Sequence, residues 1–105
     1  MVNRQMQLRL AVVEEWGRSG RVEDVDCLME WLEPEMTFTT SRLVDYALGL
    51  VTTPEGEAHI QHYLFEGTAV QRNYAALYFK RRGEMKVLDL AVRRGCIDEL
   101  QAFSK

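Results

Sequence analysis

The chain has 105 residues, of which 47% are hydrophobic and 28% charged, and its formal net charge is −3. This balance is close to the globular average and excludes a disordered chain, while the length suits one domain with its own core. No apolar run approaches the roughly 18 residues of a membrane span, and the start lacks a secretory cleavage site. The two cysteines, Cys27 and Cys96, fit no metal or redox spacing. We therefore expect a cytoplasmic protein with reduced, buried thiols.

The first third of the chain predicts two helices, because apolar residues recur in it at helical spacing. The first helix runs from Asn3 to Trp16, with a stripe of Met6, Leu10, Val13 and Trp16 widened by Leu8 and Val12. The stretch "GRSG" (17–20) stops it, since glycine tolerates the positive φ of a helix end. The second helix begins near Arg21, carries Val22, Val25, Leu28, Met29 and Leu32, and is closed by Pro34. Trp16 and Trp31 fall near the ends of this pair and are expected to pack together.

Two more helices follow a threonine-rich stretch. "TFTTS" (37–41) offers N-cap hydroxyls for a helix whose apolar residues are Leu43, Val44, Ala47, Leu48 and Val51. A short extended piece at 37–40 is the most strand that the sequence allows. "TTPEGE" (52–57) is typical of a helix start, with a capping threonine, a proline in the first turn and two acids. Ile60, Tyr63 and Leu64 then face inward, and Gly67 ends that helix.

The last third predicts a buried helix followed by two others. Thr68 caps the buried helix, and "YAALYFKRRG" (74–83) is apolar almost all round. Within it we expect mostly buried side chains for Tyr74, Ala76, Leu77 and Phe79. Gly83 ends this helix, and the next reaches Gly95 with Val87, Leu88, Leu90 and Ala91. A final segment brings Ile97, Leu100 and Phe103 onto one inward side as a C-terminal cap.

The turns recur at a period near 33, at about Gly17, Leu50 and Gly83. Helical hairpins repeated at such a period are the signature of an α-solenoid, in which each hairpin buries its face on the next. The sequence therefore predicts a single all-α domain over residues 1–105. We expect a small α-solenoid of about three antiparallel helical hairpins plus a C-terminal capping helix.

The predicted buried helix that Thr68 caps and the helix after it resemble a HEAT-type repeat of the short bacterial kind related to phycobilin-lyase repeats. Family positions are matched by Arg72, Ala75, Ala76 and Phe79, by the turn Gly83–Glu84, and by Val87 and Leu90. The chain departs from the family at Gln71, where valine is usual. A rival resemblance is to ankyrin repeats, carried by Leu88, Leu90, Ala91, Gly95 and Leu100, although Asp89 stands where that family has histidine. Either resemblance implies a helical interaction module without catalysis.

Cations gather in the last third of the chain. Residues 1–67 hold five cations and twelve acids, a net charge of −7, whereas residues 68–105 hold eight cations and four acids, a net charge of +4. Cations in a last helical turn before a glycine satisfy exposed carbonyls, and Asp89 lies at ion-pair spacing from Arg93. Helix termination is therefore favoured over phosphate binding. The candidate partner or phosphate contacts are Arg72, Lys80, Arg81, Arg82, Lys86 and Arg93.

Other polar residues give no catalytic or metal pattern. His59 and His62 lie one turn apart, but no acid or thiol occupies the matching turn, so an ordinary helix face is favoured over a metal site. The acids near the start (Glu14, Glu15, Glu23, Asp24 and Asp26) indicate solvated faces or an acidic patch. No base is spaced to activate a nucleophile, and no glycine-rich phosphate loop occurs. We expect neither an enzyme nor a bound metal or cofactor.

The preferred hypothesis is a non-catalytic protein–protein interaction module whose groove binds a partner segment. The alternative is a nucleic-acid-binding helical-repeat protein that uses the basic last third. A metal or redox protein using the histidines or cysteines is a third hypothesis. Head-to-tail self-association of the acidic and basic parts is also open, and no membrane contact is expected.

Overall fold

The structure, a computed structural model, describes the backbone of residues 4–104 and the side chains of residues 7–104. All regular structure in that range is α-helical, without a strand, which confirms the all-α prediction. The helices are α1 (Arg4–Ser19), α2 (Val22–Glu30), α3 (Phe38–Leu48), α4 (Pro54–Glu66), α5 (Ala69–Arg81), α6 (Met85–Arg93) and α7 (Glu99–Phe103). The chain divides into two compact units, Met1–Glu57 and Ala58–Lys105. The predictions for Asn3 and for the side chain of Met6 lie outside the described residues.

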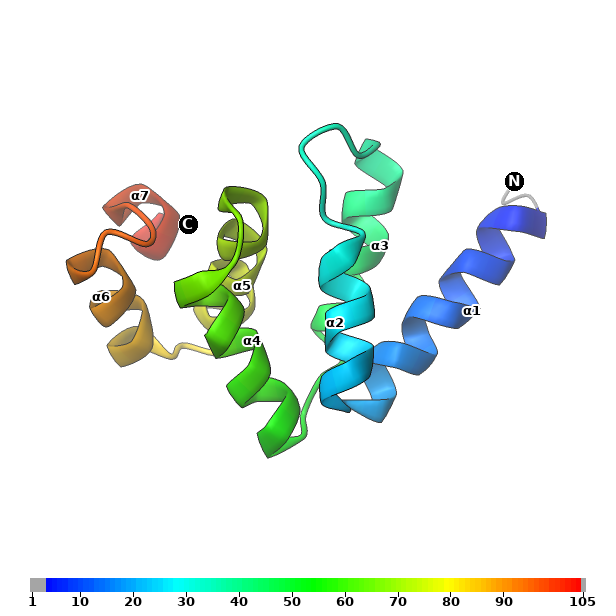
Figure 1. Ribbon diagram of the computed structural model, residues 1–105, viewed down its shortest axis with the longest axis horizontal. Coiled ribbons are helices and arrows are strands. Elements are labelled where there is room, and N and C mark those ends of the chain that lie inside the picture. The colour runs from blue at the N-terminus through cyan, green and yellow to red at the C-terminus, as the bar shows by residue number, and fades with distance from the viewer. Residues whose placement is uncertain (1–3, 105) are drawn as a thin grey trace. The chain divides into compact units, whose positions relative to one another are not determined.

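In the first unit, α1, α2 and α3 each pack against the other two (Figure 1). The buried side chains are those of Val13, Val25, Leu28, Met29, Leu32, Val44, Ala47, Leu48 and Val51. α1 and α3 approach most closely at Gly17, where an added Cβ would collide with the carbonyl oxygen of Ala47. α1 continues through Gly17 and ends at Ser19, because Gly20 adopts a φ of +63°. The prediction that the stretch 17–20 stops this helix is confirmed, although the helix runs past Trp16.

The end of α2 also differs from the prediction. α2 ends at Glu30, and Pro34 lies in the loop beyond it. The amides of Trp31 and Leu32 donate to the carbonyls three residues earlier, at 3.2 and 3.1 Å. This tightened turn brings Leu32 into the core, so the chain leaves the helix before proline can stop it. The expected tryptophan contact is confirmed, since the rings of Trp16 and Trp31 pack edge to face with centroids 5.4 Å apart.

Threonine hydroxyls cap α3 and α4 as predicted. Thr37 accepts a hydrogen bond from the amide of Thr40 at 3.1 Å, so residues 38–40 are helical rather than extended. Thr53 accepts from the amide of Gly56 at 3.0 Å and donates to the carbonyl of Gly20 at 2.6 Å. One hydroxyl thus caps α4 and holds the chain that follows α1.

In the second unit, α5, α6 and α7 each pack against the other two. Thr68 and Gln71 form a reciprocal capping box at the start of α5. α5 ends in a Schellman motif with Gly83 at a φ of +69°, where the amide of Glu84 donates to the carbonyl of Phe79 at 3.0 Å. α6 ends in the same way at Gly95, with a φ of +74°. The prediction that basic last turns followed by glycine end these helices is confirmed.

Burial in α5 follows the prediction only in part. Ala76 and Phe79 are buried, together with Ala75 and Tyr78. Tyr74 and Leu77 are only half-buried. The expectation that all four predicted residues are mostly buried is therefore wrong for these two, and α5 faces solvent along one side.

The predicted inward side of the final segment is wrong at two positions. Leu100 and Phe103 are exposed, by 75% and 44%, and Leu90 of α6 is exposed by 40%. Ile97 is buried as expected. α7 begins at a capping box between Asp98 and Gln101, and the residue that it buries is Ala102 instead.

Two of the predicted hairpin pairs, α1 with α2 and α5 with α6, are packed together. The finer solenoid arrangement and the single domain stay predictions.

Candidate interaction surface on α1 and α3

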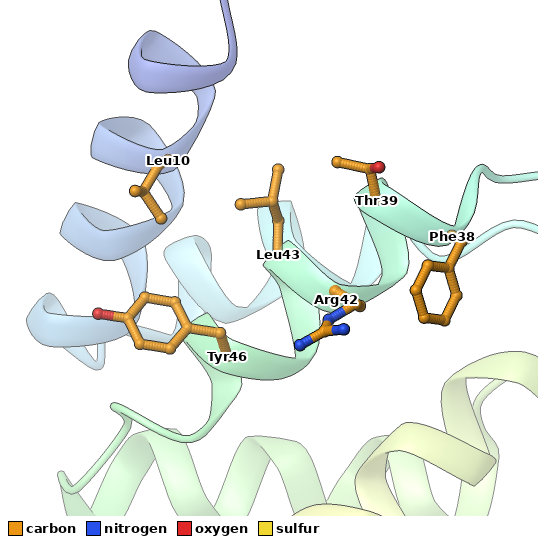
Figure 2. A pocket seen from close by; sticks show the side chains of 6 residues that line it. All are labelled: Leu10, Phe38, Thr39, Arg42, Leu43 and Tyr46. Atoms are coloured by element: carbon orange, nitrogen blue, oxygen red, sulfur yellow. The ribbon is translucent and has the colours of Figure 1, made fainter. Parts of the chain in front are cut away.

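A hollow of about 550 Å³ opens on the first unit between α1 and α3. Its lining comes from one residue of α1 and five of α3: Leu10, Phe38, Thr39, Arg42, Leu43 and Tyr46. Figure 2 shows the ring of Tyr46 reaching from α3 toward α1, with Leu10 directed into the same space. We call this feature the α1–α3 hollow. Most of its surface is hydrocarbon, so it favours an apolar occupant.

The hollow exists because α3 is apolar on two sides. One side carries Val44, Ala47 and Leu48 and is buried in the core of the first unit. The other side carries Phe38 and Tyr46, which are 74% and 46% exposed. The core can take only one of these faces, so the second remains on the surface.

Polar contacts hold the rim of the hollow in place. The Tyr46 hydroxyl donates to Oε2 of Glu14 at 2.8 Å, and Arg18 pairs with the same oxygen at 3.4 Å. The hydrogen bond to Glu14, aided by desolvation, raises the pKa of the Tyr46 phenol above its ordinary value. At the other end the guanidinium of Arg42 lies 5.5 Å from the ring centre of Phe38. The lining is therefore positioned before any partner arrives.

The sequence analysis missed this surface. Leu10 and Leu43 were predicted only as apolar residues of their helices, and both are half-buried at the hollow. A signal was present, because Phe38, Arg42 and Tyr46 stand four residues apart and form one stripe of the α3 helix. Such a stripe of two rings and a cation beside the core face indicates a second contact surface.

A second, smaller hollow in the first unit is lined in part by Arg9. Its volume is about 360 Å³, and its lining is Arg9, Glu30, Trp31, Glu33, Glu35, Met36, Thr37 and Thr40. Arg9 is engaged there, because it donates to Oγ1 of Thr40 at 2.6 Å and lies 5.4 Å from the centre of the Trp31 ring. This site is better explained as an internal brace between α1 and the loop before α3.

Among the candidate basic contacts, Arg72 has the most internal role. Its Nε donates to the carbonyl of Cys96 at 2.7 Å, and its Nη1 donates to the carbonyl of Gly67 at 2.9 Å. One half-buried side chain thus joins the chain after α6 to the chain after α4. Both acceptors stand beyond helix ends, where carbonyls lack partners within the helix.

The other candidate cations are spread over the second unit. Lys80 donates to Oγ of Ser104 at 3.2 Å, and the guanidinium of Arg82 lies 3.9 Å from the centre of the Tyr78 ring. Arg93 pairs with Asp89 at 3.0 Å, as the sequence predicted. Arg81 and Lys86 are exposed. Most of these cations therefore stabilise the second unit itself.

The histidines and cysteines form no recognisable reactive site. The rings of His59 and His62 stack with centroids 5.6 Å apart, and no group of three metal-ligating side chains occurs within residues 7–104. Cys27 and Cys96 are both free and half-buried. Burial, with Asp24, Glu30 and Asp26 adding to it, raises the pKa of the Cys27 thiol, which keeps that thiol protonated and unreactive.

Comparison with known proteins gives no relative. No family model, no curated protein and no solved structure matches the chain. Within the part of the chain that the structure describes, no helix has the length and apolar character to cross a membrane.

Proposed function

We propose that this chain is a non-catalytic protein-interaction module on a HEAT-like helical-repeat scaffold, and that the α1–α3 hollow receives the partner. The observation that carries the proposal is the exposed apolar lining, above all Phe38 and Tyr46. Contiguous apolar surface is costly to leave in water, and in soluble proteins it usually marks a binding site. Tyrosine, phenylalanine and arginine are also the residues most enriched where proteins meet.

The arrangement at the rim supports binding rather than catalysis. Glu14 is engaged by both Tyr46 and Arg18, so its carboxylate is held within the rim. The Tyr46 phenol donates to Glu14 at 2.8 Å, which fixes the position of its ring at the rim. A preorganised rim around an apolar floor lowers the entropic cost of docking.

The helical-repeat scaffold is supported by local packing in the second unit. Ala75 and Ala76, two of the residues that carry the HEAT resemblance, are buried where α5 packs against α6 and α7. Their small side chains allow helices to approach closely. The resemblance and this packing together favour a repeat whose role is to present a surface.

Nucleic-acid binding receives less support. The Arg72 guanidinium already donates to two carbonyls, Arg93 has its aspartate, and Arg82 lies over a ring. Phosphate binding needs cations directed together at one ligand. Replacing Arg81 and Arg82 by glutamine tests this alternative directly, because a phosphate contact would lower affinity for DNA or RNA at about 0.15 M salt.

The experiment that tests the proposal compares two equally exposed residues. Phe38 and Leu100 are 74% and 75% exposed, one at the hollow and one on α7. Phe38→Asp and Leu100→Asp should both fold, as far-ultraviolet circular dichroism checks. Affinity capture from the source cell, read by quantitative mass spectrometry, should lose its specific partners with Phe38→Asp and keep them with Leu100→Asp. If Phe38→Asp captures the same proteins as the unchanged chain, the hollow is not the binding surface.

A further inference from the structure

The outer face of α1 carries a second exposed feature, which the first unit does not use. Leu8 and Val12 are 60% and 39% exposed, and Glu15 is exposed beside them. They stand at spacings of four and three, so they share one face of the helix. This face presents two aliphatic side chains followed by a carboxylate. The α1–α3 hollow has an apolar lining and one cation, Arg42, so it is complementary to apolar side chains beside a carboxylate.

The two charges concerned lack ion-pair partners. Arg42 stacks on Phe38, and neither Arg42 nor Glu15 forms an ion pair with any described residue. A carboxylate brought against Arg42 at the edge of the hollow would form a charge-assisted hydrogen bond. Opposite charges placed this way set the register of a contact more than they add affinity.

We propose that α1 of a second copy of this chain occupies the α1–α3 hollow, with Leu8 and Val12 of one copy against Leu43 and Tyr46 of the other and Glu15 facing Arg42. This inference rests on the proposed function, because it names the partner of the same surface. The first unit carries both halves of the contact. In the proposed arrangement each copy supplies its α1 to the other, so the contact forms twice around a two-fold axis and the pair closes as a dimer.

A head-to-tail contact through the basic last third is the competing form of self-association. Residues 1–67 carry a net charge of −7 and residues 68–105 one of +4, so two copies attract each other in that mode as well. That contact is heterologous, and unless its rotation closes a ring it produces chains longer than a dimer. It also depends on Arg81 and Arg82 rather than on Glu15 and Arg42.

A charge exchange between copies tests the inference. Glu15→Arg places two arginines together at each contact, and Arg42→Glu places two glutamates there. Each variant alone should dimerise at least tenfold more weakly than the unchanged chain, by light scattering coupled to size exclusion. An equimolar mixture of the two variants should recover the dimer. In the mixed pair, the arginine introduced at position 15 of one copy meets the glutamate introduced at position 42 of the other, while the native Glu15 meets the native Arg42.

An apolar pair of variants provides the matched control. Leu8→Ser should raise the dissociation constant of the dimer at least tenfold, since each copy loses a buried leucine contact. Leu100→Ser, at a leucine of α7 that is 75% exposed against 60% for Leu8, should leave it unchanged. In a dilution series followed by NMR, the amide signals of residues 8–15 and 38–46 should move with concentration, while those of α7 stay fixed.

Three results would overturn the inference. The first is a chain that remains monomeric up to a concentration of about 1 mM, at which a dimer with a dissociation constant of about 1 mM is half formed. The second is a dimer that both charge variants leave intact. The third is an association abolished by Arg81→Gln with Arg82→Gln, which indicates the head-to-tail mode. If the chain is monomeric and Phe38→Asp still loses the captured partners, only the second-copy inference is refuted. If Phe38→Asp captures the same partners as the unchanged chain, the proposed function is refuted.

Discussion

Replacing Arg72 by methionine tests whether this cation stabilises the second unit or waits for a partner. Its guanidinium joins the carbonyls of Gly67 and Cys96, at 2.9 and 2.7 Å. Methionine keeps an unbranched stem of similar length and removes both donors. The two carbonyls then need water, and the chain segments after α4 and α6 lose the side chain that holds them together.

The expected cost follows from these two contacts. A hydrogen bond from a charged group contributes roughly 1.5–3 kcal/mol. Arg72 is half-buried and water can reach the freed carbonyls in part, so the lower end of that range applies to each of the two hydrogen bonds. For the loss of both bonds together, we expect Arg72→Met to cost about 2–3 kcal/mol. Arg72→Lys should cost about half of that, because an ammonium is a point donor and does not reproduce the guanidinium geometry.

Urea titration read by far-ultraviolet circular dichroism measures the loss, with Arg93→Met as the control. Arg93 also loses a charged contact, but its pair with Asp89 is solvent-exposed and should contribute less than about 0.5 kcal/mol. Tryptophan fluorescence reports the unfolding of the first unit separately, because Trp16 and Trp31 both lie in that unit whereas Arg72 lies in the second. An Arg72→Met protein no less stable than Arg93→Met would refute the structural role of Arg72.

Three further predictions concern packing and titration. Gly17→Ala should lower the free energy of unfolding by about 3 kcal/mol in urea titration, because the new Cβ meets the backbone of α3. Gly83→Ala should cost only about 1–2 kcal/mol, since its new Cβ meets nothing and only the positive φ is strained. Equal costs would contradict the close approach of α1 and α3. Phe79→Ala should lower the free energy of unfolding by about 3–5 kcal/mol, as for a buried ring, and a loss below about 1 kcal/mol would show that α5 is peripheral. Glu14→Gln should lower the pKa of Tyr46 toward its ordinary value, seen as tyrosinate absorbance at lower pH. Because the pKa of Tyr46 is raised in the folded state, the contact with Glu14 stabilises the fold below the ordinary phenol pKa, and that contribution is lost as the pH rises above it. If Glu14→Gln leaves the titration of Tyr46 unchanged, Glu14 is not the cause of the raised pKa.

Helix ends were the features that the sequence predicted best. The caps at Thr37, Thr53 and Thr68 and the stops at Gly83 and Gly95 depend on residues within one turn of each other, so local chemistry decides them. The packing role of Gly17 was not predicted, for the opposite reason. Its role comes from α3, about thirty residues away, and no local pattern distinguishes a packing glycine from a stop.

The candidate surface depends equally on distant partners. Periodicity marks Leu8, Val12 and Leu43 as apolar stripe residues, and it cannot tell which stripe the core covers. Leu100 and Phe103 show the same limit, because α7 buries Ala102 rather than the side that spacing suggests. An excess of apolar faces over available neighbours is what makes a binding surface, and that excess appears only once the helices are packed.

The packed helices of each unit are also neighbours along the chain, and this has a kinetic consequence. α1, α2 and α3 meet after short connections, and so do α5, α6 and α7. Contacts between segments close in sequence require little loop closure before they form, and helical proteins of this kind fold in microseconds to milliseconds. Stopped-flow refolding should therefore finish largely within the instrument's dead time. Newly synthesised chains should spend little time with the core-facing sides of α1 and α3 open to unintended association.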